Sequence, residues 1–94
     1  MEQWKCLNFV VTGRVQRVGF RNYTHQIALE LNLLGFVKNV SDGSVAGHVA
    51  GPSHSVETFI NRLRSGPPLA KVGHIFTETA EAINYSGFEI QVES

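Results

Sequence analysis

The spacing of the apolar residues changes at Phe20, and this change constrains the fold more than any other feature of the chain. Residues 5–12, KCLNFVVT, are rich in β-branched and aromatic types and alternate well enough to predict a strand. From Phe20 to Leu34 the apolar residues recur every three or four positions, which predicts a helix with one buried face, and Gly35 is placed to end it. A strand therefore turns into a helix through residues 13–19.

The remaining segments alternate in the same way. Residues 35–40 and 45–50 predict two strands joined at Asp42-Gly43 by a two-residue type I′ turn, because Asp-Gly supplies the positive φ angles of that turn. After Gly51-Pro52, a second helix is expected, with Ser53 or Ser55 as its cap and Gly66 at its end. Its buried side would be Val56, Phe59, Ile60 and Leu63.

Two strand candidates complete the chain. Residues 70–79 predict a fourth strand. Residues 87–92 predict a short last strand that extends or pairs with the fourth, with Phe88, Ile90 and Val92 facing inward. This order is typical of an α+β, ferredoxin-like βαββαβ sandwich, in which two helices cover one face of an antiparallel sheet, here with a short extra C-terminal strand.

Size and charge limit the partners. The 94 residues are enough for one core and too few for two, so we expect a single domain over residues 1–94. The net charge of zero provides no overall field for nucleic acid or anionic membranes, so we expect neither as a partner, and a monomer. The lone Cys6 cannot close an intramolecular disulfide, and no apolar run approaches the roughly 20 residues of a membrane span, so a cytoplasmic location is expected.

The turn after the first strand has the residues of an anion site. The first N–H groups of a helix are unpaired, and Gly13 and Gly19 allow the backbone to approach an oxyanion without a Cβ in between. Arg21, in the first helical turn, can form paired hydrogen bonds to a phosphate. The same spacing also fits an ordinary turn with solvated arginines, so by itself it leaves both interpretations open.

Two segments resemble the acylphosphatase family. Residues 13–21, GRVQRVGFR, are similar to its signature G-x-V-Q-G-V-x-F-R, and residues 35–45 are similar to its G-x-V-x-N-x-x-D-G-x-V. The resemblance implies hydrolysis of small acyl phosphates to a carboxylate and inorganic phosphate, with neither a metal nor another cofactor. It implies that Arg21 and the loop amides bind the phosphoryl group and that Asn39 positions the attacking water. The loop residues are Val15, Gln16, Arg17, Val18, Gly19 and Phe20.

The chemistry of an acyl phosphate explains why such a site needs only hydrogen-bond donors. The leaving carboxylate has a conjugate acid with a pKa of about 4, so it needs no general acid, and the phosphoryl group can accept the proton of the water. No catalytic dyad or metal cluster is apparent, and the four histidines fall on different predicted elements, at the surface or at caps. These are His25, His48, His54 and His74.

Arg17 stands where the family signature has its second glycine. If this position needs a positive φ, a non-glycine residue there costs about 1 kcal/mol or more. Either Arg17 points outward and attracts anions, or it disturbs the amides and weakens the enzyme. An anion-binding domain without turnover, as in larger maturation proteins, is therefore the alternative function. An RNA-binding domain shares this element order but needs exposed aromatics on its central strands, and residues 45–50, VAGHVA, have none.

Overall fold

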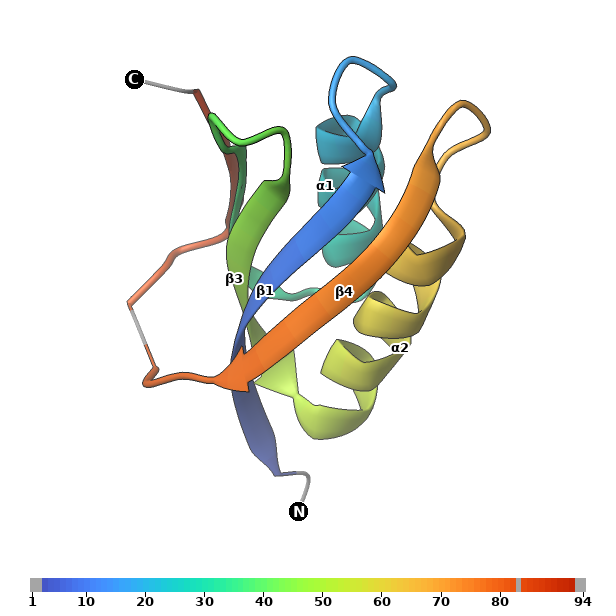
Figure 1. Ribbon diagram of the computed structural model, residues 1–94. Coiled ribbons are helices and arrows are strands. Elements are labelled where there is room, and N and C mark those ends of the chain that lie inside the picture. Colours follow the sequence, from blue (N-terminus) through green and yellow to red (C-terminus); the bar gives the residue numbers. More distant parts are fainter. Residues whose placement is uncertain (1–2, 83, 93–94) are drawn as a thin grey trace.

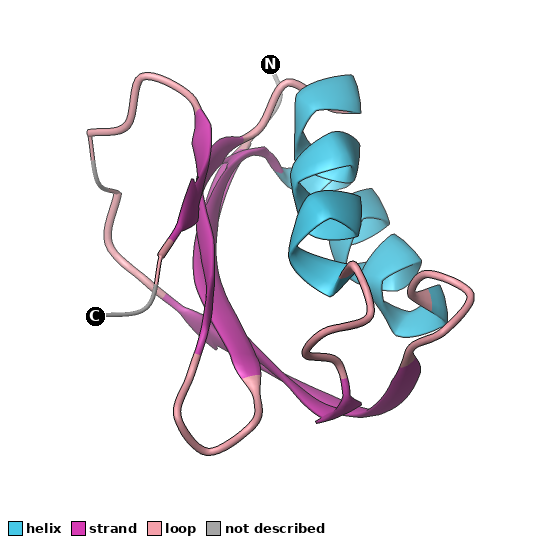
Figure 2. Cartoon of the chain, turned by 90° about the horizontal axis from the view of Figure 1, so that it is seen from above, coloured by secondary structure: helices cyan, strands magenta, loops and turns pink. Residues whose placement is uncertain are grey.

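The computed structural model describes residues 3–82 and 84–92. The strands of this part are β1 (Trp4–Arg14), β2 (Leu34–Asn39), β3 (Val45–Pro52), β4 (Lys71–Thr79) and β5 (Phe88–Gln91), and its helices are α1 (Phe20–Glu30) and α2 (Ser53–Ser65). The five strands form one sheet in the order β4-β1-β3-β2-β5, and both helices cover the same face (Figures 1 and 2). The predicted ferredoxin-like α+β sandwich is confirmed, with strands that pair antiparallel except for β2 and β5.

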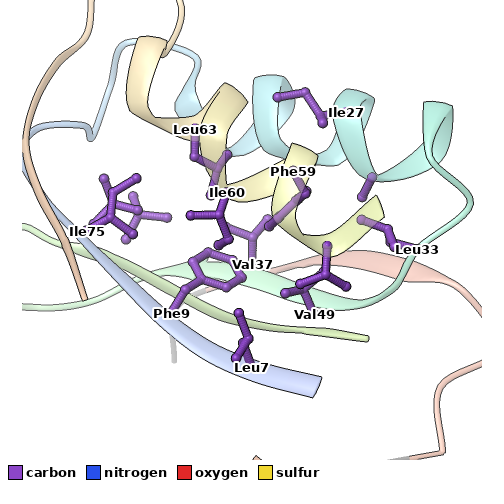
Figure 3. Close-up of a cluster of buried hydrophobic side chains, with 14 of the residues drawn as sticks. Leu7, Phe9, Ile27, Leu33, Val37, Val49, Phe59, Ile60, Leu63 and Ile75 are labelled. Atoms are coloured by element: carbon purple, nitrogen blue, oxygen red, sulfur yellow. The ribbon is translucent and has the colours of Figure 1, made fainter. Parts of the chain in front are cut away.

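The core lies between the helices and the sheet (Figure 3). The alternation of β1 points Phe9 toward the helices, where its ring packs edge-on against the ring of Phe59 with the two ring centroids 5.5 Å apart. Val49 on β3, Val37 on β2 and Ile27 on α1 are almost completely buried around this pair. Burial of each such side chain stabilises the fold by roughly 1.5–3 kcal/mol. This packing fixes how α1 and the ends of the central strands lie relative to one another.

The first helix ends earlier than predicted, at Glu30 rather than before Gly35. Asn32 has a φ of 55°, and its N–H donates to the Leu29 carbonyl while the Leu33 N–H donates to the Ala28 carbonyl. This is a Schellman ending, with asparagine in place of the commoner glycine. Gly35 instead lies in β2, at a φ of 137°, where a Cβ would come within 1.9 Å of the His48 carbonyl oxygen. The glycine is therefore required by strand pairing and not by the helix end.

The connection between β2 and β3 is also different from the prediction. The Gly43 N–H donates to the Val40 carbonyl, and the Val40 N–H donates to the Ser44 carbonyl. Of residues 41–43, only Gly43 has a positive φ, so the loop is not a two-residue type I′ turn. It is a three-residue loop of the kind that a left-handed glycine closes. The Asp42 carboxylate accepts hydrogen bonds from the N–H and Oγ of Ser44, which lowers the pKa of Asp42.

Three expectations about the later elements were wrong. The second helix begins at Ser53 itself, after Pro52, and no side chain caps it, so neither Ser53 nor Ser55 is the cap, although Gly66 follows its last residue as predicted. The last strand does not pair with the fourth. It pairs parallel with β2, at the opposite edge of the sheet from β4. Val92 follows its end and is 87% exposed rather than inward-facing.

His48, predicted to lie at the surface or at a cap, is buried. It lies on the sheet face opposite the helices, where its Nδ1 lies 3.1 Å from Oδ1 of Asn8 on the neighbouring strand. The ring of Tyr85, from the segment between β4 and β5, lies 5.9 Å away and covers it. Nε2 of His48 has no hydrogen-bond partner in the described part of the chain, and burial lowers the pKa of the imidazole.

Candidate active site

Residues 15–19, here called the β1–α1 loop, connect the end of β1 to the start of α1 (Figure 1). The backbone has a positive φ at Gly13, Arg17 and Gly19, with values of 113°, 64° and 79°. At Gly13 a Cβ would lie 2.2 Å from the Lys71 carbonyl oxygen, because β1 and β4 shift register there. At Arg17 the chain adopts the left-handed conformation that a glycine would take easily, with an arginine instead. These positions turn the chain from the end of β1 into the helix.

The β1–α1 loop has backbone donors without partners. In the described structure, no hydrogen bond uses the N–H groups of residues 16–19. The helix that follows has the left-handed Gly19 as its N-cap, with no side-chain cap and no acidic residue in its first turn. The partial positive charge of the helix N-terminus is thus not offset by the protein. Such an arrangement suits an anion.

A pocket of about 240 Å³ lies beside this loop. It is lined by Val15, Arg17, Gly19, Phe20, Arg21, Asn22, Asn39 and Ile90. Six of the eight residues predicted for the site therefore lie together: three come from the β1–α1 loop, two from the first turn of α1 and one from the end of β2. The lining contains two arginines and no carboxylate, so the pocket favours an anionic ligand.

Arg21 is half-buried and belongs to the first turn of α1. Its Nη1 donates a long hydrogen bond of 3.5 Å to the carbonyl of Gln91, the last residue of β5. The bond directs the guanidinium toward the pocket wall formed by β5, and the other N–H groups of this side chain make no hydrogen bond in the described structure. A guanidinium has five donors in a planar fork, which suits two oxygens of a phosphate.

Asn39 is the last residue of β2 and pairs with Val45 on β3. Its side-chain oxygen, Oδ1, is buried, and it has no hydrogen-bond partner within the described residues. A buried polar atom without a partner is unfavourable by roughly 1–3 kcal/mol and is uncommon in folded proteins. Asn39 also lines the pocket, so a rotation of its side chain brings this acceptor to a water molecule or a ligand there.

The other two predicted residues do not line the pocket. Val18 is half-buried and packs against the core. The side-chain amide of Gln16 donates to the carbonyls of Val40 and Ser44, at 2.7 and 2.8 Å. Gln16 thus links the β1–α1 loop to the β2–β3 loop directly after Asn39, and Figure 1 shows both loops at the same end of the molecule. Sequence reasoning missed this role because the partners are 24 and 28 residues away.

Features of other site types are missing from the described residues. They contain no group of three or more His, Cys, Asp or Glu side chains that could hold a metal ion. None of the helices described here is long and apolar enough to cross a membrane. Cys6 is buried, as its apolar neighbours suggest.

The fold and the pocket together define a ferredoxin-like sandwich with a small, arginine-lined pocket where its first strand meets its first helix. The chain belongs to the acylphosphatase family, whose model matches residues 7–90. Members of this family are hydrolases that act on acyl phosphates, and the predicted function is confirmed at this level.

Similar proteins support the assignment over nearly the whole chain. An acylphosphatase of Archaeoglobus fulgidus is 42% identical over 85 residues, which cover 90% of this chain and 96% of that protein. An acylphosphatase of Vibrio vulnificus is 41% identical over 86 residues, covering 92% and 96%. The structure of an acylphosphatase from Coxiella burnetii superposes with a TM-score of 0.90 at 35% identity, covering 94% of this chain and 93% of that one. These relatives favour the enzyme over the alternative of an anion-binding domain without turnover.

Proposed function

We propose that the pocket beside the β1–α1 loop is the active site and that it hydrolyses small acyl phosphates without a metal. The observation that carries this proposal is that Asn39, whose buried Oδ1 has no hydrogen-bond partner among the described residues, lines the same pocket as Arg21 and part of the β1–α1 loop. Donors for a phosphoryl group and an acceptor for a water molecule are thereby available in one small cavity.

The donors bind and stabilise the phosphoryl group. The N–H groups of residues 16–19 and the N-terminus of α1 bind its oxygens, and the Arg21 guanidinium neutralises its charge. In phosphoryl transfer the negative charge is spread over the equatorial oxygens, so fixed donors around them are the main source of catalysis. The hydrogen bond from Arg21 to the Gln91 carbonyl is long, so rotation of the guanidinium toward a phosphate gives up little.

Asn39 positions the nucleophile. Its Oδ1 accepts a hydrogen bond from a water molecule, whose oxygen then attacks the phosphorus atom opposite the leaving carboxylate. The bond between phosphorus and the bridging oxygen breaks, and the electron pair leaves with the carboxylate. The proton of the water goes to a phosphoryl oxygen, so the products are a carboxylate and inorganic phosphate. Because the leaving group is a weak base, no side chain needs to protonate it.

Phosphate release from benzoyl phosphate tests these roles. Loss of one charge-assisted contact corresponds to about 1.5–3 kcal/mol, so we expect Arg21→Ala to lower kcat/KM at least tenfold. Asn39→Ala should lower kcat while inhibition by inorganic phosphate is retained, because the donors are still present. Arg64→Ala and Asn61→Ala, two exposed positions on α2, are matched controls and should hydrolyse at the wild-type rate. Equal rates for all five proteins would contradict the proposal.

We also infer that the protein acts as a cytoplasmic monomer with neither a nucleic acid nor a membrane partner. The net charge of zero and the single, buried cysteine support this inference. Light scattering after gel filtration should give the mass of one 10.4 kDa chain, and the mass of a dimer would contradict it. A mobility shift with single-stranded RNA that weakens as salt is added would favour the RNA-binding alternative.

A further inference from the structure

We propose that Arg17 makes the pocket selective for acyl phosphates whose acyl part carries a second anionic group, either a carboxylate or a phosphate. The inference rests on the proposed function of the pocket and names its substrate class. It starts from the replacement of a family glycine by an arginine that lines the pocket.

The backbone at Arg17 is the first observation. Its φ of 64° lies in the left-handed region, which a residue with a Cβ adopts at a cost of roughly 1–2 kcal/mol. A glycine at this position would have no such strain. The loop nevertheless keeps this left-handed geometry with an arginine in place of glycine. The presence of a side chain at residue 17 therefore lowers the stability of the folded protein. Strained residues of this kind are concentrated at functional sites.

The charge of Arg17 is the second observation. Within the described structure, its guanidinium forms neither an ion pair nor a hydrogen bond. Glu30 forms an ion pair with Arg62, and Glu57 forms one with Lys5. No acidic side chain lines the pocket. The phosphoryl group is bound by the loop amides and Arg21 in the proposed reaction. The positive charge of Arg17 is therefore left for another group of the substrate.

The position of Arg17 indicates where that group lies. Both arginines line the pocket, and Arg17 is exposed whereas Arg21 is half-buried, so Arg17 is the more solvent-accessible of the two cations. With the phosphoryl group bound by Arg21 and the loop amides, the acyl part extends toward solvent and past Arg17. A carboxylate or phosphate at the outer end of the acyl part would meet the guanidinium, whereas an acetyl or benzoyl group offers it no anion.

The test compares two substrates of the same shape, benzoyl phosphate and 4-carboxybenzoyl phosphate, at low ionic strength. The quantity measured is the ratio of kcat/KM for the carboxylated substrate to that for the neutral one. An ion pair between exposed groups contributes only a small free energy. We therefore expect this ratio to fall about two- to fivefold in Arg17→Gly and to be largely kept in Arg17→Lys. Arg14→Ala, which removes an exposed arginine at the end of β1 that does not line the pocket, should keep the wild-type ratio. Salt should reduce the wild-type preference.

A second measurement separates this inference from the proposed reaction. Calorimetric titration with benzoylphosphonate and its 4-carboxy derivative, which cannot be hydrolysed, should show the same two- to fivefold change in relative affinity for Arg17→Gly. If no protein hydrolyses either acyl phosphate but the affinity ratio changes in this way, the proposed reaction fails and the role of Arg17 stands. If both ratios are the same in the wild type and Arg17→Gly, the role of Arg17 is overturned, whatever the rates are.

Discussion

Replacing Gln16 by leucine tests how the two halves of the site are held together. The side-chain amide donates to the Val40 and Ser44 carbonyls, and each bond contributes about 0.5–1.5 kcal/mol. Both carbonyls keep one backbone donor, from Gly43 and Val40 respectively, so neither is left without a partner. We therefore expect the free energy of unfolding to fall by about 1–3 kcal/mol. For a chain of this size that corresponds to a decrease in Tm of roughly 4–24 °C.

The same substitution should change catalysis more than binding. The loop amides and Arg21 remain on the β1 and α1 side, whereas Asn39 lies directly before the β2–β3 loop that Gln16 holds. In Gln16→Leu we expect kcat for benzoyl phosphate to fall about tenfold or more, since misplaced reacting groups are costly, with little change in the inhibition constant of inorganic phosphate. Gln26→Leu, at an exposed position of α1, is the matched control and should keep both values.

Two results would refute this reasoning about Gln16. If Tm falls while kcat and KM stay at their wild-type values, Gln16 supports only the fold. If the inhibition constant of phosphate rises as much as kcat falls, Gln16 orders the phosphate-binding loop and does not position Asn39.

Three further predictions concern strain, pH and metals. Gly35→Ala should lower the free energy of unfolding, measured in urea, by about 2–6 kcal/mol, because residue 35 has a φ of 137° and its Cβ would contact the His48 carbonyl. Gly87→Ala, at a position with open space around it, should change this free energy little. Equal losses in the two variants would contradict the contact. The lowered pKa of His48 means that the unfolded chain binds more protons than the folded one at mildly acidic pH. The contribution of neutral His48 to the free energy of unfolding is therefore fully present above pH 6.5 and is lost as the pH falls from 6.5 through the lowered pKa. His48→Gln should flatten this dependence and the exposed His54→Gln should not, and identical pH profiles would exclude His48 as its source. Hydrolysis should proceed at the same rate in EDTA, and inactivation restored by a divalent metal would contradict the proposed chemistry.

Much of the fold could be predicted because the apolar spacing is regular and glycines mark its interruptions. Both helices and the order of helices and strands along the chain follow from these patterns. The partner of β5 could not be predicted, because alternation indicates which face of a strand is buried and not which strand lies beside it. The end of α1 was misplaced because Gly35 is the stronger signal in sequence, although Asn32 adopts the left-handed ending.

For the candidate site, the residues that share a short segment could be predicted and those that depend on distant contacts could not. Arg17, Arg21 and the loop glycines lie within one stretch, and a resemblance to a known motif adds Asn39. The side-chain bonds of Gln16 depend on where the β2–β3 loop lies relative to the β1–α1 loop, and the contribution of Ile90 depends on the pairing of β5 with β2. The burial of His48 depends on Tyr85, which comes from a segment far along the chain, and no local pattern indicates that contact.

A crystal structure of the protein with inorganic phosphate would test the central claim most directly. We predict one phosphate in the pocket, with its oxygens about 2.7–3.2 Å from N–H groups of residues 16–19 and from the Arg21 guanidinium, and a water molecule hydrogen-bonded to Oδ1 of Asn39. An empty pocket at saturating phosphate, with those N–H groups bonded to other parts of the protein, would contradict it.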